Sequence, residues 1–155
     1  MDEAVRKAIY QAVEHEPFAR ALNMKLTGLE QGRSTVEMTY VPKAMNNIYG
    51  RAHGGAVFAL IDEAFETAGQ TDGTVAVALN VNVAYVSSPE EGARLRAEAR
   101  EISRTKKTAG YDIKVTDQQG KVIATCQALA YRTGKPIPFL HKNEDHEERR
   151  REHES

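Results

Sequence analysis

The chain has 155 residues, a length that fits one domain with a single sizeable core. Its formal net charge is −1, so no overall field favours binding to nucleic acid or to an anionic membrane surface. The single cysteine, Cys126, cannot form an internal disulfide, and no apolar run approaches the ~20 residues of a membrane-spanning helix. The first residues also lack the pattern of a signal peptide. We therefore expect a soluble cytoplasmic protein in which Cys126 packs as a small apolar side chain.

Two helices are predicted at the start of the chain. Apolar residues recur at every fourth position of residues 3–15, which is typical of an amphipathic helix. Pro17 begins a second, short helix. We treat residues 1–23 as an N-terminal helical segment.

A β-hairpin follows, with strands over residues 25–30 and 34–40 on either side of a turn at Gln31-Gly32. Residues 42–50 are rich in asparagine and glycine, so we expect them to form a loop.

A helix from Gly54 to about Ala68 is predicted next, and Gly69 is expected to end it. Its sequence is apolar on most sides. A helix of this kind is surrounded by other elements, because a surface helix would keep one polar face.

Four strands are predicted after this helix. Residues 75–85 alternate with period two, which indicates a long and central strand with its odd-numbered residues on one face. Further strands are expected over 94–100, 109–115 and 121–131. Three successive hairpin-like links imply an antiparallel sheet of about six strands, with the apolar helix against one face. The predicted fold class is α+β, with the main domain over residues 24–135.

The end of the chain is strongly charged from residue 141 onward and has no apolar face. We expect residues 136–155 to form a disordered tail. The spacing of His141, His146 and His153 fits no metal-ligand pattern, so no metal site is predicted there.

The run His53-Gly54-Gly55 opens the apolar helix, and Asp62 follows about two turns later. Glycines at a helix start leave bare backbone N–H groups, where a developing oxyanion is best stabilised. A carboxylate in an apolar helix is costly to bury without a polar or charged partner, and one that is kept there often has a function. We favour an oxyanion-binding Gly54 over a merely tight helix entry, and a catalytic Asp62 over a buried cap or an ion pair between subunits.

Several motifs of the chain together resemble one family. A helix surrounded by an antiparallel sheet, with a His-Gly-Gly opening and an acid in the helix, is similar to the hot-dog fold. Within it, the chain resembles the acyl-CoA thioesterases of the phenylacetic-acid-degradation type over roughly residues 15–135. The motifs that carry the resemblance are Pro17-Phe18-Ala19, Asn47, His53-Gly54-Gly55, Asp62, Asn80-Val81-Asn82-Val83-Ala84-Tyr85, Tyr111-Asp112-Ile113 and Gln119-Gly120-Lys121.

The resemblance implies hydrolysis of an acyl-CoA thioester to a free acid and CoA, with no cofactor beyond the CoA of the substrate and product. It implies that Asp62 is the general base or nucleophile and that the Gly54 N–H polarises the thioester carbonyl. Asn47 would orient the water or the thioester, and His53 would support the loop. The family also implies a homodimer whose site is built across the interface, and often a homotetramer.

Six residues are expected to contact the substrate. Some relatives carry a serine or threonine on the strand after the helix, where this chain has Ala78, so Asn80 and Asn82 are candidates to replace that hydroxyl. Basic residues near a strand turn are candidates for the CoA phosphates, with a solvated basic turn as the alternative. The predicted substrate-binding residues are Gly55, Glu66, Asn80, Asn82, Arg104 and Lys106.

Two neighbouring acids have open roles. Glu66 lies one turn after Asp62 and either tunes it, contacts the acyl group or reaches solvent. Glu63 is turned about 100° away from Asp62, and we expect it at a helix edge that reaches solvent.

Two other functions stay open at this point. One is a non-catalytic module that binds or senses acyl-CoA. The other is an enoyl-CoA hydratase or dehydratase of the same fold, in which His53 and Asp62 form the acid–base pair. The first 23 residues lack a helix-turn-helix pattern, which disfavours a DNA-binding sensor.

Overall fold

The structure is a computed structural model, and it describes residues 1–140. The three histidines predicted to lie in a disordered tail are outside the described residues. Ile137 is fully buried, so the packed part of the chain extends past the predicted boundary at residue 136. No helix within residues 1–140 has both the length and the apolarity needed to span a membrane.

The two N-terminal helices form as predicted. Helix α1 (Glu3–His15) is capped by Asp2, whose carboxylate accepts hydrogen bonds from the N–H groups of the first helical turn at 2.8 and 3.1 Å. Helix α2 (Pro17–Ala21) follows after Glu16, which ends α1 and precedes α2. The apolar face of α1 is buried and joins the main hydrophobic core.

All strands belong to one antiparallel six-stranded sheet with the order β1-β2-β4-β5-β6-β3, which confirms the predicted architecture. The short helix α3 (Pro42–Met45) lies where a loop was expected, because Pro42 starts a helical turn at its first position. The strands are β1 (Lys25–Glu30), β2 (Arg33–Thr39), β3 (Thr74–Tyr85), β4 (Arg94–Arg104), β5 (Thr108–Thr116) and β6 (Val122–Pro136).

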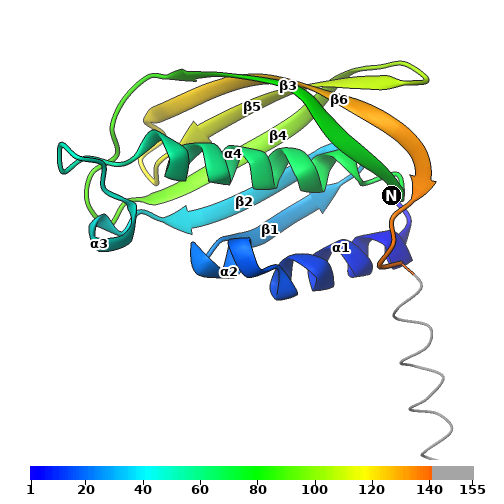
Figure 1. Cartoon of the computed structure of the whole chain (residues 1–155), viewed down its shortest axis with the longest axis horizontal. Helices are drawn as coiled ribbons and strands as arrows, with labels where there is room; N and C mark the ends of the chain where they lie inside the picture. The colour runs from blue at the N-terminus through cyan, green and yellow to red at the C-terminus, as the bar shows by residue number, and fades with distance from the viewer. Residues whose placement is uncertain (141–155) are drawn as a thin grey trace, which may run out of the picture.

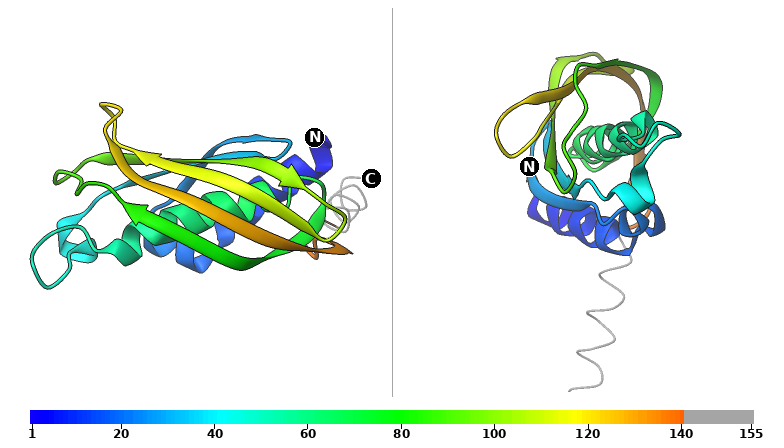
Figure 2. Two further views of the ribbon diagram at one scale, coloured as in Figure 1. Left: turned by 90° about the horizontal axis from the view of Figure 1, so that it is seen from above. Right: turned by 90° about the vertical axis from the view of Figure 1, so that its left-hand side faces the viewer.

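Helix α4 (Gly54–Gly69) lies against one face of the sheet, and the sheet curves around it (Figures 1 and 2). Helices α1 and α2 lie alongside β1 and cover α4 from below in the view of Figure 1. Leu60, Ile61 and Phe65 are at most 4 % exposed. Burial of each such side chain contributes about 1.5–3 kcal/mol, so α4 is the centre of the core.

Strand β3 does not lie where the sequence pattern suggested. It was expected in the middle of the sheet and joined by a hairpin to the next strand, but it lies at the edge and pairs with β6. Strand β4 instead pairs with β2 and β5, so the link from β3 to β4 is a crossover. Within one chain, the outer edge of this 12-residue strand therefore has no partner strand among residues 1–140.

Bulges in β3 also change which side chains face the helix. The ladder with β6 is irregular between Thr74 and Ala76 and again between Ala78 and Asn80. Val81 and Val83 pack against the core as predicted, but Val77 and Leu79 are 47 % and 56 % exposed. The single apolar face expected for residues 75–85 is therefore split, because each extra residue reverses the alternation.

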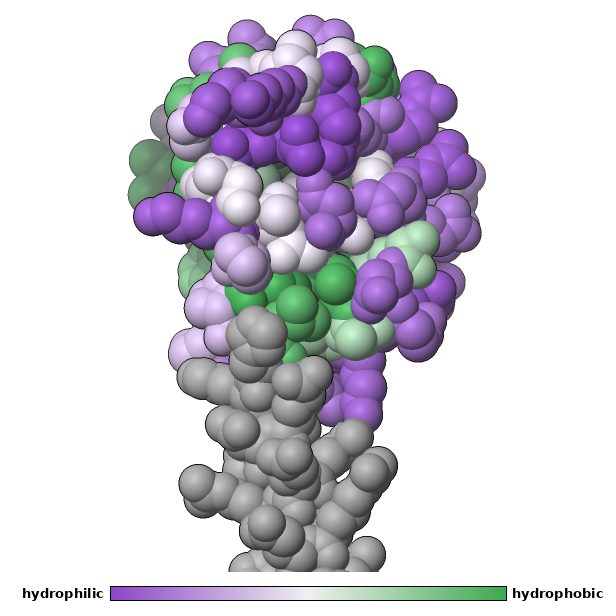
Figure 3. Space-filling view, turned by 90° about the vertical axis from the view of Figure 1, so that its right-hand side faces the viewer, coloured by the Kyte–Doolittle hydropathy of each residue, from purple (hydrophilic) through white to green (hydrophobic). Residues whose placement is uncertain are grey.

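An ion-pair network closes the end of the molecule that holds the C-terminus of α4. The Asp72 carboxylate accepts from the Arg104 and Arg132 guanidinium groups at 2.7 and 2.8 Å, and Arg104 also makes two hydrogen bonds to Glu101. Burial alone would raise the pKa of Asp72, but hydrogen bonds from Thr74 and both arginines outweigh it and hold the pKa far below its usual value. Figure 3 views this mainly hydrophilic end of the molecule.

We expect Asp72→Asn to lower the free energy of unfolding by about 1–3 kcal/mol, since the arginines lose a partly buried charged partner. The stabilisation is complete above the ordinary aspartate pKa and is lost as the pH falls through the lowered one. Urea unfolding at pH 7 measures the difference. Glu98→Gln is the control, because Glu98 pairs with Arg96 at an exposed position and should cost less than about 1 kcal/mol. Equal losses in the two variants would contradict a special role for Asp72.

Candidate functional site

The entry of α4 is built by His53 and two glycines. The His53 Nδ1 atom accepts a hydrogen bond from the Gly55 N–H at 2.8 Å and so caps the helix, with the ring proton on Nε2. A Cβ atom at Gly55 would lie 3.0 Å from this Nδ1, which explains the small residue there. This contact is consistent with the supporting role that the resemblance implied for His53.

The Gly54 N–H has no hydrogen-bond acceptor in the described part of the chain. It is the first amide of a 16-residue helix, where the helix dipole adds positive potential. An unpaired N–H at this position can donate to a carbonyl oxygen of a ligand. The geometry is consistent with the oxyanion donor predicted at Gly54.

Asn47 organises the loop before the helix. Its Oδ1 atom accepts from the N–H groups of Tyr49 and Arg51 at 2.9 and 3.1 Å, and its own N–H donates to the Arg51 carbonyl. The His53 N–H closes the loop by donating to the Met45 carbonyl at 2.7 Å. The Asn47 Oδ1 atom is therefore committed to the loop, and only its amide N–H groups can reach a ligand.

Tyr85 is a part of this site that the sequence reasoning did not identify. Its hydroxyl donates to the Gly54 carbonyl at 3.1 Å, and a Cβ atom at Gly54 would lie 3.2 Å from its ring. The contact joins the end of β3 to the start of α4. Its signal in the sequence was the alternation that places Tyr85 on the same face as Val81 and Val83.

Asp62 lies on the stripe of α4 that the described part of the chain leaves open. Gly55, Phe58 and Glu66 belong to the same stripe, and Phe58 is 37 % exposed. Asp62 itself is half-buried, and burial raises the pKa of its carboxyl group. This environment favours a carboxylate that takes up a proton readily.

Gly54 and Asp62 cannot act on the same atom within one chain. They are eight residues apart on a straight helix, which separates them by about 12 Å along the axis. A donor and a base that share one carbonyl group must each come within about 3 Å of it.

Asn80 and Asn82 are both exposed, and they lie on the face of β3 that points away from α4. Ala78 pairs with the buried Ala130, on the α4 face, whereas Asn80 pairs with the exposed Leu129. The bulge between Ala78 and Asn80 causes this reversal. Neither asparagine can therefore replace a hydroxyl at Ala78 in its own chain, and this expectation was wrong.

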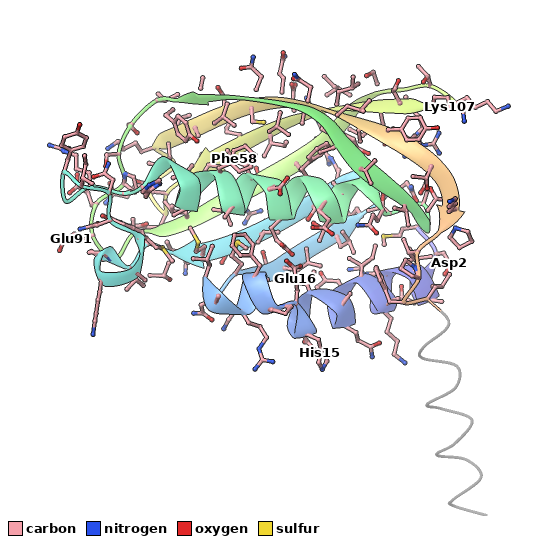
Figure 4. All side chains as sticks on the ribbon, in the orientation of Figure 1. Asp2, His15, Glu16, Phe58, Glu91 and Lys107 are labelled. Atoms are coloured by element: carbon pink, nitrogen blue, oxygen red, sulfur yellow. The ribbon has the colours of Figure 1, made fainter. Side chains whose placement is uncertain are left out.

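The two basic residues predicted to bind substrate have different environments. The Arg104 guanidinium is neutralised by Asp72 and Glu101, so it is not an open phosphate-binding group. Lys106 is exposed in the turn between β4 and β5. This turn lies at the opposite end of the molecule from the start of α4, as the label on Lys107 shows in Figure 4.

Glu63 differs most from its prediction. It was expected at a solvent-reaching helix edge but is only 3 % exposed, because Glu16 and the end of α1 cover it. Glu66 is exposed, and its Oε1 atom lies 3.5 Å from the Gln70 amide nitrogen.

The chain has clear relatives among known proteins. Residues 49–124 match the model of the thioesterase superfamily. A protein of Archaeoglobus fulgidus that is assigned provisionally as an esterase is 32% identical over 138 residues, which are 89% of this chain and 87% of that protein. The Escherichia coli acyl-coenzyme A thioesterase PaaI is 31% identical over 124 residues, covering 80% of this chain and 88% of its own.

Solved structures agree with these matches. The structure of E. coli PaaI superposes with a TM-score of 0.82 at 29% identity and covers 87% of this chain and 97% of that one. A Streptococcus mutans protein bound to acetyl CoA has a TM-score of 0.69 at 30% identity, covering 74% and 92%.

The sequence matches extend over most of the chain, and the six-stranded antiparallel sheet around α4 is the fold of these relatives. The chain therefore belongs to the thioesterase superfamily and is a hot-dog thioesterase of the PaaI type.

Proposed function

We propose that the protein hydrolyses acyl-CoA thioesters, using Gly54 as the oxyanion donor and Asp62 as the general base. The observation that carries this proposal is the unpaired Gly54 N–H at the start of the helix that also bears Asp62. The name of E. coli PaaI and the acetyl CoA in the S. mutans structure support CoA thioesters as the substrate class.

In the proposed reaction, Asp62 takes a proton from a water molecule while that water attacks the thioester carbonyl carbon. The carbonyl oxygen becomes an oxyanion, which the Gly54 N–H stabilises. Collapse of this intermediate breaks the carbon–sulfur bond, and the proton on Asp62 passes to the leaving sulfur. The products are a free acid and the CoA thiol, so water is the only co-reactant and no separate cofactor takes part.

Two other residues support this chemistry in the proposal. The free amide N–H groups of Asn47 orient the water or the thioester, and His53 holds the helix entry through its bond to Gly55. The His53 Nδ1 bond to Gly55 leaves Nε2 as the ring nitrogen that could exchange protons with a substrate, so this histidine alone does not separate the hydrolase from the hydratase alternative.

The proposal includes a homodimer in which Gly54 of one chain approaches Asp62 of the other. Two features support this homodimer, in addition to the separation of about 12 Å between Gly54 and Asp62 within one chain. The outer edge of β3 carries unpaired backbone groups, which favour pairing with a second strand. Val77 and Leu79 on β3 and Phe58 on α4 are exposed apolar side chains, whose burial against a second chain would be favourable. Assembly of dimers into a tetramer and a cytoplasmic location stay predictions from the sequence.

We expect Asp62→Asn to lower thiol release from acyl-CoAs by at least ~10², because the amide cannot accept the proton. In the unaltered protein, the rate should rise with pH through the raised pKa of Asp62, since only the ionised carboxylate is a base. A panel of acyl-CoAs with a thiol reagent measures both effects, and size-exclusion chromatography checks that the oligomer is kept.

Asp112→Asn is the matched control, because Asp112 is a half-buried aspartate on β5 and not on α4. It should retain near-normal turnover. An active Asp62→Asn enzyme would refute the assigned base. Hydration of an enoyl-CoA without thiol release would instead identify the hydratase, and CoA binding without turnover would identify the non-catalytic module.

We expect Leu79→Lys to produce monomers with little hydrolase activity, because a charge on the open β3 edge opposes strand pairing. Light scattering and thiol release report the two properties on the same sample. Ile102→Lys, at a position that is 50 % exposed on β4, is the control and should change neither. A fully active monomer would contradict a site shared between chains.

A further inference from the structure

Three carboxylates from separate parts of the chain converge beside α4, outside the proposed catalytic residues. Glu63 and Glu66 are three positions apart on α4 and share a face, and Glu16 comes from the junction of α1 and α2. One carboxylate oxygen of each lies within 4.8 Å of those of the other two. Figure 4 shows Glu16 between this junction and α4.

We call these residues the Glu16 cluster (Glu16, Glu63 and Glu66), and its buried member, Glu63, has an unsatisfied oxygen atom. Its side chain is 3 % exposed, and its Oε1 atom has no hydrogen-bond partner in the described part of the chain. An unpartnered buried carboxylate oxygen is costly, and native proteins rarely leave one without a proton, water or ion. Burial, and then the charges of Glu16 and Glu66, raise the pKa of Glu63 to about 8.

No basic side chain in the described part of the chain neutralises the cluster. Within residues 1–140, no ion pair joins any of the three glutamates to a lysine or arginine. A cavity of about 260 Å³ adjoins them and is lined by neither residue type. His15 also borders the cavity, but its Nδ1 is hydrogen-bonded to the Gln11 carbonyl, and its side chain points away from α4 (Figure 4).

We propose that the Glu16 cluster binds a divalent cation that prefers oxygen ligands, such as Ca²⁺, Mg²⁺ or Mn²⁺. Three carboxylates provide the charge and the ligand type that these hard cations require, and the cavity has room for coordinating water. The bound ion would join the junction of α1 and α2 to α4 and so fasten the N-terminal helices to the core. This inference does not rest on the proposed function, because the ion contacts neither Gly54 nor Asp62.

Mn²⁺ binding, followed by electron paramagnetic resonance after treatment with a chelator, tests the proposal on the full chain. We expect one bound Mn²⁺ per chain and a higher Tm in Ca²⁺ or Mg²⁺, because the ion binds the folded state. Glu63→Gln and Glu16→Gln should each weaken Mn²⁺ binding at least about tenfold, since affinity follows the number of charged ligands. Glu14→Gln, an exposed change on α1, removes the same charge and should leave binding intact.

Two results would overturn the proposal. If both cluster variants bind Mn²⁺ as tightly as the unaltered chain, the ion is held elsewhere, for example by the acidic and histidine residues after residue 140. If the unaltered chain binds no Mn²⁺ at millimolar concentration, Glu63 holds a proton instead. Glu16 is only partly buried, so Glu16→Gln keeps the test decisive if Glu63→Gln fails to fold. Thiol release, measured separately, reports on the hydrolase independently of the ion.

Discussion

The burial of α4 within the curved sheet is the constraint on which the rest of the structure depends. It makes the helix a rigid rod whose first amide and whose acid keep a separation of about 12 Å. Because the sheet covers most of the helix, one stripe is left open, and it carries both Asp62 and Phe58. In the proposed mechanism the oxyanion donor Gly54 and the base Asp62 are therefore at separate places on each chain, which is a physical reason for a second copy.

The edge position of β3 in the sheet also favours association with a second copy of the chain. A long strand with an unpaired edge and exposed apolar residues promotes aggregation of an isolated chain. In a dimer, a partner strand can pair with this edge. Tyr85 links the two features, since it lies at the end of β3 and donates to the Gly54 carbonyl. Any partner strand that pairs with β3 therefore lies close to the amide proposed to bind the oxyanion.

Two acidic side chains of this fold, Asp72 and Glu63, have pKa values shifted in opposite directions. Asp72 receives two arginines and stays ionised, so it stabilises the end of the domain. Glu63 is buried beside other carboxylates, and its burial, followed by their charges, raises its pKa instead. The junction of α1 and α2 adds to this shift, because it places Glu16, and not a basic residue, beside Glu63.

The sequence by itself determined the helices other than α3, the six strands, the apolar helix as the core, and the glycine entry followed by Asp62. These features depend on local periodicity and on turn residues, which act over short stretches of chain. Only the tertiary structure decided the edge position of β3, the reversal of Asn80 and Asn82, the pairing of Arg104 and the burial of Glu63. Each of these depends on contacts between residues distant in sequence: β6 against β3, Asp72 against Arg104, and Glu16 against Glu63. A pattern within one strand or helix carries no record of which distant segment lies beside it.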